Sequence, residues 1–220
     1  MGYSDDDGTN WSPPMNLTKK LKDPTWYLLA PAPGCGIMMQ DGTLAVPVQG
    51  RGNSQRCFST IMTSKDHGES WILASSFARS GTNECAVAEL SYGKLMLNMK
   101  NVDSRGARAV ALTSELGSTW SVHPSVSLLA EPACMASLLR VERTNGWSAL
   151  LLSNPANKTR RKHLTIKVSF DDGLTWPERY WLTRIDFVHA RRYKYVDTNI
   201  RNSVLLMHCV IPQNHYSYTR

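Results

Sequence analysis

Lysine and arginine residues outnumber the acidic residues in this 220-residue chain, and much of the excess lies in two stretches. The chain has 25 Lys and Arg against 18 Asp and Glu, a formal charge of +7, and the two stretches are residues 158–162 and 184–201. Guanidinium and ammonium groups bind anions such as carboxylates and phosphates. No nucleic-acid-binding motif accompanies the charge. A solvated face or a site for a small anionic molecule therefore explains it better than a nucleic acid partner.

One short motif occurs four times, at residues 4–11, 64–71, 113–120 and 169–176. The copies read SDDDGTNW, SKDHGESW, TSELGSTW and SFDDGLTW and begin 60, 49 and 56 residues apart, so a unit of this size repeats along the chain. We expect each motif to form a tight turn, because its carboxylate accepts nearby backbone N–H groups and its glycine supplies a positive φ. The tryptophan should then enter the next strand and pack between neighbouring units. Glu115 replaces Asp in the third copy, so that turn should be looser.

Neither a metal centre nor a disulfide framework is indicated. The cysteines are odd in number, widely spaced and free of CxxC pairs, and we expect buried thiols. The DDDG sequence of the first motif begins like a calcium loop but lacks the bidentate glutamate that such a loop needs. No cofactor is expected. The five cysteines are Cys35, Cys57, Cys85, Cys134 and Cys209.

The elements that must position these residues are short β-strands. Gly, Pro, Asn and Asp clusters separate the apolar runs, and only residues 15–22 suggest a turn of helix. About four short strands per repeat are typical of propeller blades, so we expect an all-β fold. No run approaches the roughly 18–20 apolar residues of a membrane span. The predicted strands include residues 43–48, 57–63, 86–90, 94–98, 107–112, 134–141, 148–153 and 164–169.

The motifs and the segments between them resemble the sialidases (neuraminidases) of the six-bladed propeller superfamily, which carry Asp-box repeats, and look close to the bacterial exo-α-sialidases. The matching segments cover nearly everything from residue 4 to about residue 181. The resemblance implies a sialidase-type β-propeller with about four blades represented, the central blades at residues 1–181 and a divergent tail at residues 182–220. The segments are DPTWYLLAPAPGCGIMMQD (23–41), TNECAVAELSYGKLMLN (82–98), EP followed by CMAS (131–137) and SNPANKTRRKHLTIKVSFDDGLTWP (153–177).

The resemblance also implies a reaction, the release of terminal α-linked sialic acid from glycoproteins, glycolipids or oligosaccharides. Sialic acid carries a carboxylate on its anomeric carbon, which would repel a carboxylate nucleophile. Sialidases use a neutral tyrosine, activated by a glutamate, and are an exception to the usual pair of carboxylates. Three arginines clamp the substrate carboxylate. A separate aspartate acts as acid and base at the glycosidic oxygen.

Several of these roles carry over to positions in this chain. Glu84 matches the glutamate that activates the tyrosine, with Glu89 as the competing candidate. Lys100 stands where the second clamp arginine is expected, and a lysine keeps the charge but loses the bidentate geometry, so affinity for the carboxylate should fall. Arg105 and Arg108 are near in sequence, but neither obviously substitutes.

The third clamp arginine matches Arg161, with Arg160 as its rival, whereas Lys158 and Lys162 are expected to solvate a loop. Tyr193 lies at about the right distance for the nucleophile, although the residues after it depart from the family pattern. The first clamp arginine and the catalytic aspartate have no match. With 220 residues against the roughly 300 or more that six blades need, we expect a fragment or a truncated product.

Two further hypotheses remain open. A non-catalytic propeller that binds sialylated glycans would accommodate Lys100 and the unmatched acid, and an unrelated interaction propeller would share only the turns. The amino-terminal MGYSDDDG is not a signal peptide. The bacterial family is expected outside the cell or in the periplasm.

Overall fold

Short strands dominate the structure, a computed structural model that describes residues 1–103, 105–142, 148–180 and 183–185. The strands form three antiparallel sheets in the described residues, and Thr18–Leu21 form a single helical turn, α1. Both the all-β fold and the helical turn near residues 15–22 are confirmed. Three 3-10 turns complete the described elements: η1 (Ser91–Gly93), η2 (Pro124–Leu128) and η3 (Glu178–Tyr180).

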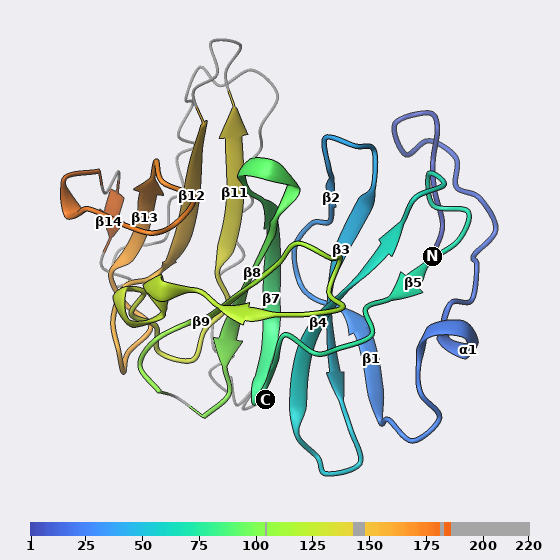
Figure 1. The fold of residues 1–220 in the computed structure, drawn as a ribbon, viewed down its shortest axis with the longest axis horizontal. Helices are drawn as coiled ribbons and strands as arrows, with labels where there is room; N and C mark the ends of the chain where they lie inside the picture. The colour runs from blue at the N-terminus through green and yellow to red at the C-terminus, as the bar shows by residue number, and fades with distance from the viewer. Residues whose placement is uncertain (104, 143–147, 181–182, 186–220) are drawn as a thin grey trace, which may run out of the picture.

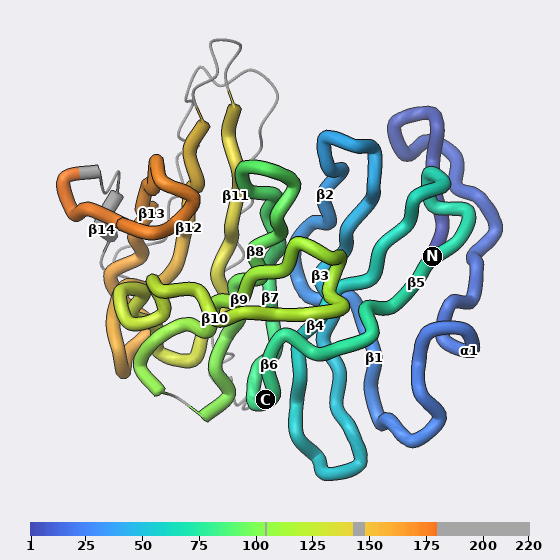
Figure 2. Tube along the Cα trace, viewed as in Figure 1, coloured from blue at the N-terminus to red at the C-terminus, as the bar shows by residue number. Residues whose placement is uncertain are grey.

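Consecutive stretches of chain build the three sheets, and Figure 2 shows the trace passing from one sheet to the next along the sequence. The first sheet contains β1 (Leu28–Pro31), β2 (Ile37–Met38), β3 (Leu44–Arg51), β4 (Cys57–Ser64), β5 (Ile72–Leu73) and β6 (Arg79–Ser80). The second contains β7 (Thr82–Glu89), β8 (Leu95–Asn101), β9 (Ala109–Thr113) and β10 (Ser121–Val122). The third contains β11 (Ser137–Glu142), β12 (Ser148–Pro155), β13 (Leu164–Ser169) and β14 (Thr183–Ile185).

Two opposite ends follow from the antiparallel strands. The loops 51–57, 101–109, 130–137 and 155–164 lie at one end, which we call the site end. The repeated motifs at residues 64–71, 113–120 and 169–176 lie at the other, the turn end, each between the third and fourth strands along its sheet. The sheets share this polarity, because β3 contacts β7 at both ends: Gln49 lies beside Glu84 and Gln40 beside Glu89.

Strands β7 to β9 of the second sheet are covered on both faces, because this sheet packs between the other two (Figure 1). Alternate residues of β8 point to opposite faces: Leu97 packs in the cluster shared with the first sheet, and Met96 in the cluster shared with the third. Val110 of β9 joins the second cluster. Burial on both faces explains why apolar residues occupy consecutive positions at 95–97 of β8 instead of alternating with polar ones.

The repeated motifs form the turns that their sequences predict. In the second copy, Ser64 Oγ donates to Asp66 Oδ1 at 2.7 Å and accepts from Gly68 N at 2.8 Å, while Ser70 N donates to Asp66 Oδ1 at 2.9 Å. Gly68 has a φ of +96°, as expected. Hydrogen bonds from Ser70 and Ser64 lower the pKa of Asp66 to about 2. Trp71 Nε1 closes the turn on Gly68 O.

Two of the turns contact the neighbouring sheet: the third copy contacts the first sheet, and the fourth copy contacts the second. Trp120 Nε1 donates to the backbone oxygen of Ser76 in the first sheet's connection, and Ser76 Oγ donates back to Gly117 O at 2.8 Å. Trp176 packs in the cluster between the second and third sheets. Trp11 departs from the expectation and is 68% exposed, because no described sheet packs against its turn: a side chain added at Gly8 would meet only Trp11.

Glu115 changes the hydrogen bonding of the third copy. Its carboxylate accepts from the hydroxyls of Ser118 and Thr119, whereas Asp66 also accepts a backbone N–H. The longer side chain of Glu115 is therefore held in the turn by two rotatable hydroxyl groups, with no backbone N–H donor among the described residues.

The described helices contain none that is long and apolar enough to span a membrane.

The described cysteines are all free thiols and differ in exposure. Cys85 and Cys134 are buried, as expected, but Cys35 is exposed and Cys57 is half-buried, so the prediction of buried thiols holds for only part of the set. Cys209 lies outside the described residues.

We expect thiol modification to follow this pattern. Burial raises the pKa of Cys85 to about 12, so near pH ~8 almost none of it is thiolate, the reactive form. Iodoacetamide should label Cys35 in the native protein and Cys85 only after unfolding, as read by mass spectrometry of the peptides. Labelling of Cys85 at the native rate of Cys35 would contradict the packing described here.

Candidate functional site

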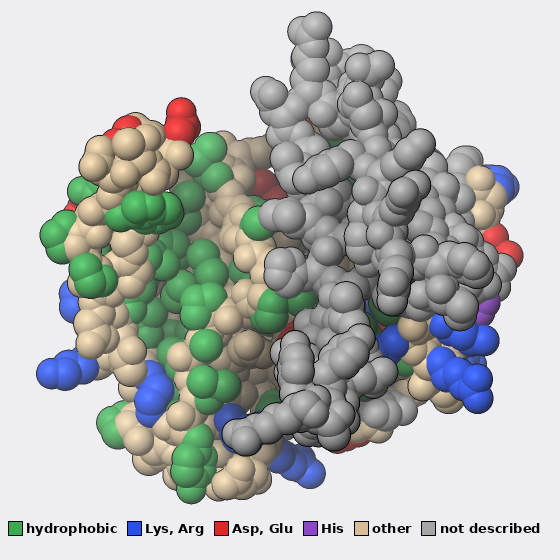
Figure 3. All heavy atoms as spheres, turned by 180° about the vertical axis from the view of Figure 1, so that it is seen from behind, with side chains coloured by type: hydrophobic (Ala, Val, Ile, Leu, Met, Phe, Trp, Pro, Cys, Tyr) green, Lys and Arg blue, Asp and Glu red, His purple; other side chains and the backbone are tan. Residues whose placement is uncertain are grey.

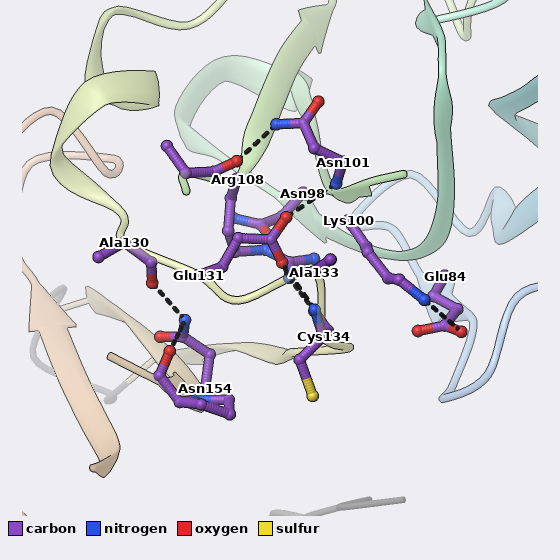
Figure 4. A network of polar contacts seen from close by, with 12 residues as sticks. Glu84, Asn98, Lys100, Asn101, Arg108, Ala130, Glu131, Ala133, Cys134 and Asn154 are labelled. Atoms are coloured by element: carbon purple, nitrogen blue, oxygen red, sulfur yellow. Dashed lines mark hydrogen bonds and ion pairs between the residues drawn. The ribbon is translucent and has the colours of Figure 1, made fainter. Parts of the chain in front are cut away.

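Glu84 and Lys100 meet at the site end, on neighbouring strands of the second sheet (Figure 4). Lys100 Nζ lies 2.9 Å from Glu84 Oε1, and the two side chains are 15% and 28% exposed. A carboxylate and an ammonium are thus paired at a partly open surface. A ligand that approaches this surface meets both groups.

A β-bulge directs the Glu84 side chain. Asn83 pairs with Lys100 and Cys85 with Met99, so Glu84 is the extra residue, and its φ is +40°. Its backbone N–H, which has no strand partner, donates to Gln49 Oε1 at 3.1 Å. Bulges and left-handed non-glycine residues are enriched next to functional sites.

A buried ion pair supports the strand end that carries Lys100. Glu131 and Arg108 are almost fully buried, and Arg108 Nη1 donates to Glu131 Oε2 at 3.0 Å. Glu131 also accepts from Asn101 N at 2.8 Å and from Cys134 N at 3.2 Å. Burial raises the pKa of Glu131 and lowers that of Arg108, because both charges have left water, although each opposes the shift of the other.

The same pair fixes the connection that leads into β11. Arg108 Nη1 donates to Cys134 O at 2.7 Å, so Arg108 and Glu131 hold Cys134 from both sides. The preceding residue, Ala133, has a φ of +48°, and its carbonyl accepts from Arg161 Nη2 at 3.4 Å. Arg161 is therefore tied to this connection, although its side chain is exposed.

Contacts link Arg161 to the strand end that carries Lys100: Arg161 Nη2 donates to Ala133 O, and Glu131 accepts from both Cys134 N and Asn101 N. Burial raises the pKa of the Cys134 thiol, the charges of Arg161 and Lys100 oppose the rise, and that of Glu84 adds to it. All three charges therefore act on one thiol. Two cations and one carboxylate around a partly open surface can bind a small carboxylate and leave an acid–base group beside it.

A second buried cation lies behind the site. Lys167 Nζ donates to Asn154 Oδ1 at 2.6 Å, and Asn154 Nδ2 donates to Ala130 O at 2.8 Å. Burial, helped by the charge of Arg108, lowers the pKa of Lys167 to about 8. These contacts connect β12 and β13 to the connection before β11.

The competing candidates differ from these residues in position or in partner. Glu89 is at the turn end, where its carboxylate accepts from Gln40 N at 2.9 Å. Arg105 pairs with Asp103 on an exposed loop. Glu84 and Lys100 are therefore in direct contact at the site end, where Arg161 also lies, whereas Glu89 is at the opposite end. Arg160 is exposed next to Arg161, and Tyr193 lies outside the described residues.

Sequence reasoning missed the supporting residues. Gln49, Asn98 and the Arg108–Glu131 pair were assigned no role in the predicted site, yet Arg108 Nε donates to Asn98 Oδ1 and Gln49 holds the bulge. The signal for Glu131 was present in the matching Glu131-Pro132 segment. In the described residues, no group of three or more His, Cys, Asp and Glu side chains is placed to hold a metal ion.

Comparisons with known proteins agree with this architecture. Residues 2–219 match the family described as BNR repeat-like domain. A sialidase of Bacteroides fragilis is 45% identical over 187 residues, which are 83% of this chain and 34% of that protein. A sialidase of Clostridium perfringens is 32% identical over 189 residues, covering 78% of this chain and 49% of that protein. The chain thus spans about a third to a half of the length of these relatives.

Solved structures give the same result for the fold. The Hadza microbial sialidase Hz136 superposes with a TM-score of 0.76 at 47% identity, covering 80% of this chain and 35% of that chain. A Trypanosoma rangeli sialidase in complex with sialic acid gives a TM-score of 0.62 at 25% identity, over 78% of this chain and 30% of that chain. The predicted sialidase-type β-propeller fold is confirmed.

Proposed function

Because this chain belongs to the family of BNR repeat-like domains, and the relatives above are sialidases, we propose that it serves in the release of terminal α-linked sialic acid from glycoconjugates. The observation that carries the proposal is the Glu84–Lys100 pair at the site end, together with Arg161 on a connection that Glu131 ties to the same strand end. A carboxylate-bearing sugar needs cations for its carboxylate and an acid–base group beside its anomeric carbon. This grouping supplies both.

Each of these residues has a distinct part in the proposed reaction. Arg161 and Lys100 hold the substrate carboxylate. Lys100 contributes a single point charge, whereas a guanidinium can donate two parallel hydrogen bonds to the carboxylate. Glu84 takes the proton of the tyrosine nucleophile, for which Tyr193 is the proposed residue. The ion pair with Lys100 keeps the Glu84 carboxylate oriented until a ligand draws the lysine away.

The test is hydrolysis of a 4-methylumbelliferyl sialoside by the full-length gene product. We expect fluorophore release, and a loss of about a hundredfold or more in kcat for Glu84→Gln, because the amide cannot accept the proton. Glu89→Gln is the matched control, since its carboxylate lies at the opposite end, and it should leave kcat within about twofold. Equal loss in both variants would contradict the assignment of Glu84.

A non-catalytic sialoglycan-binding propeller is the second candidate. The ion pair between Lys100 and Glu84 favours it, because both groups are engaged with each other rather than left open. Calorimetry with sialyllactose separates the two candidates. Binding without turnover supports the second, whereas absence of binding removes both.

We further propose that the protein works outside the cytoplasm, in the extracellular space or periplasm. The support is the resemblance to bacterial exo-α-sialidases, whose glycoconjugate substrates are presented there. Fractionation of the producing cells followed by immunodetection tests it, and recovery only in the cytoplasmic fraction would overturn it.

A further inference from the structure

The two ends of the molecule differ in the balance of exposed charge. At the turn end the exposed acids outnumber the exposed cations Lys65 and Lys94; these acids include Asp41, Asp66, Glu69, Glu115 and Glu142. The exposed cations of the site-end loops are Arg51, Arg56, Arg105, Lys158, Arg160 and Arg161. In the face drawn in Figure 3, Lys and Arg side chains gather mainly along the lower part, on the side of the site end in this view.

The cations of loop 155–164 lie on a structured scaffold. Ala156 N donates to His163 O at 2.9 Å, and Asn157 Oδ1 accepts from Thr159 N and Arg160 N at 3.0 and 2.8 Å. The loop also rests on loop 101–109, since a side chain added at Gly106 would come within 3.2 Å of Lys158 Cβ. The two cationic loops are therefore adjacent.

These cations exceed what a single carboxylate requires. Lys158, Arg160 and Arg161 take part in no ion pair with another described residue, whereas Arg105 is neutralised by Asp103. Lys158 is only three residues from Arg161, so the two backbones are within about 11 Å, which is near the Debye length in physiological salt. A second anionic group close to Arg161 is therefore within the range over which the charges of Lys158 and Arg160 attract it.

We propose that Lys158 and Arg160 form a second anion subsite, which selects glycans that carry another carboxylate or sulfate next to the sialic acid. The inference rests on the proposed function, because it takes Arg161 as the position of the first carboxylate. The sequence predicts only that Lys158 solvates its loop. In this proposal, Lys158 also attracts the ligand. The acidic turn end repels the same ligand and so orients its approach.

The test compares ligands that differ only in the second charge, by calorimetry on the full chain. The probes are sialyllactose, α2,8-disialyllactose and a sulfated sialyllactose. We expect both doubly charged probes to bind about three- to tenfold more tightly than sialyllactose, the range for two exposed charge contacts. The preference should shrink as NaCl rises from about 50 to about 300 mM.

Two double variants test whether Lys158 and Arg160 cause the preference for doubly charged probes. Lys158→Gln with Arg160→Gln should abolish the preference and change sialyllactose binding less than about twofold. Lys65→Gln with Lys94→Gln removes the same charge from the turn end and should leave the preference intact. Enhancement by the second sialic acid alone, or equal loss in both double variants, would overturn an electrostatic subsite.

The outcomes distinguish this inference from the proposed function. Binding of sialyllactose without any preference for doubly charged probes overturns the subsite alone. If no probe binds, both fall together. If binding and preference are present without hydrolysis, the subsite stands and the hydrolytic function is contradicted.

Discussion

Glu131→Ala should destabilise the protein by about 3–5 kcal/mol, because it leaves Arg108 buried with no carboxylate beside it. The loss is large against the roughly 5–15 kcal/mol that stabilise a typical domain. It also removes the acceptor of two backbone N–H groups, those of Asn101 and Cys134. Urea denaturation followed by circular dichroism measures the free energy of unfolding.

Glu142→Ala is the control for this experiment. Its carboxylate also pairs with an arginine, Arg140 at 2.7 Å, but is 47% exposed, so its removal should cost about 0–1 kcal/mol. Combining Arg108→Met with Glu131→Leu should recover part of the loss, since no charge is then left unpaired. A cost for Glu131→Ala no larger than that of Glu142→Ala would show that the pair is not buried as described.

Gly117→Ala should be the second strongly destabilising change, at about 2–5 kcal/mol. Gly117 has a φ of +86°, which costs alanine about 1–2 kcal/mol. Its new Cβ would also lie 2.5 Å from Ala74 Cβ, and Ala74 is fixed to the first sheet and cannot rotate away. Overpacking of this kind adds about 1–3 kcal/mol. Thermal unfolding by calorimetry gives the value.

Gly42→Ala isolates the packing contribution. Gly42 has nearly the same φ, +85°, but nothing within 4 Å of its added Cβ, so it should show the backbone cost alone. Gly173→Ala should fall between the two, because the atom it meets at 2.7 Å is the flexible end of Met96. Equal losses of stability at Gly117 and Gly42 would mean that the third turn does not pack closely against Ala74 of the first sheet.

Local rules were enough to predict an all-β array of repeated units, whereas the sialidase-type propeller came from the family resemblance. The turn motifs carry their own hydrogen-bonding partners within eight residues, so Asp66 and Gly68 adopt the expected geometry without help from distant chain. The strands follow from apolar runs between those turns. The exposure of Trp11 was missed because burial of a tryptophan depends on what packs against its turn, which a local pattern does not contain.

The candidate site was less predictable. Glu84 and Lys100 meet because a bulge adds one residue to β7, and no local pattern shows where that residue falls. Arg108, Glu131 and Lys167 are charged, so composition places them at the surface, whereas their partners come from other strands and make burial possible. Arg161 was identified through the family pattern rather than through its contacts.

The two-faced burial of the second sheet also has a consequence for the order of assembly. A chain emerging from the ribosome can close the first interface once β9 is made, but the face bearing Met96 and Val110 waits for Leu150 of β12. During that interval a nascent chain displays an apolar sheet surface to its neighbours. A chaperone that recognises such surfaces would be needed most at this stage of synthesis.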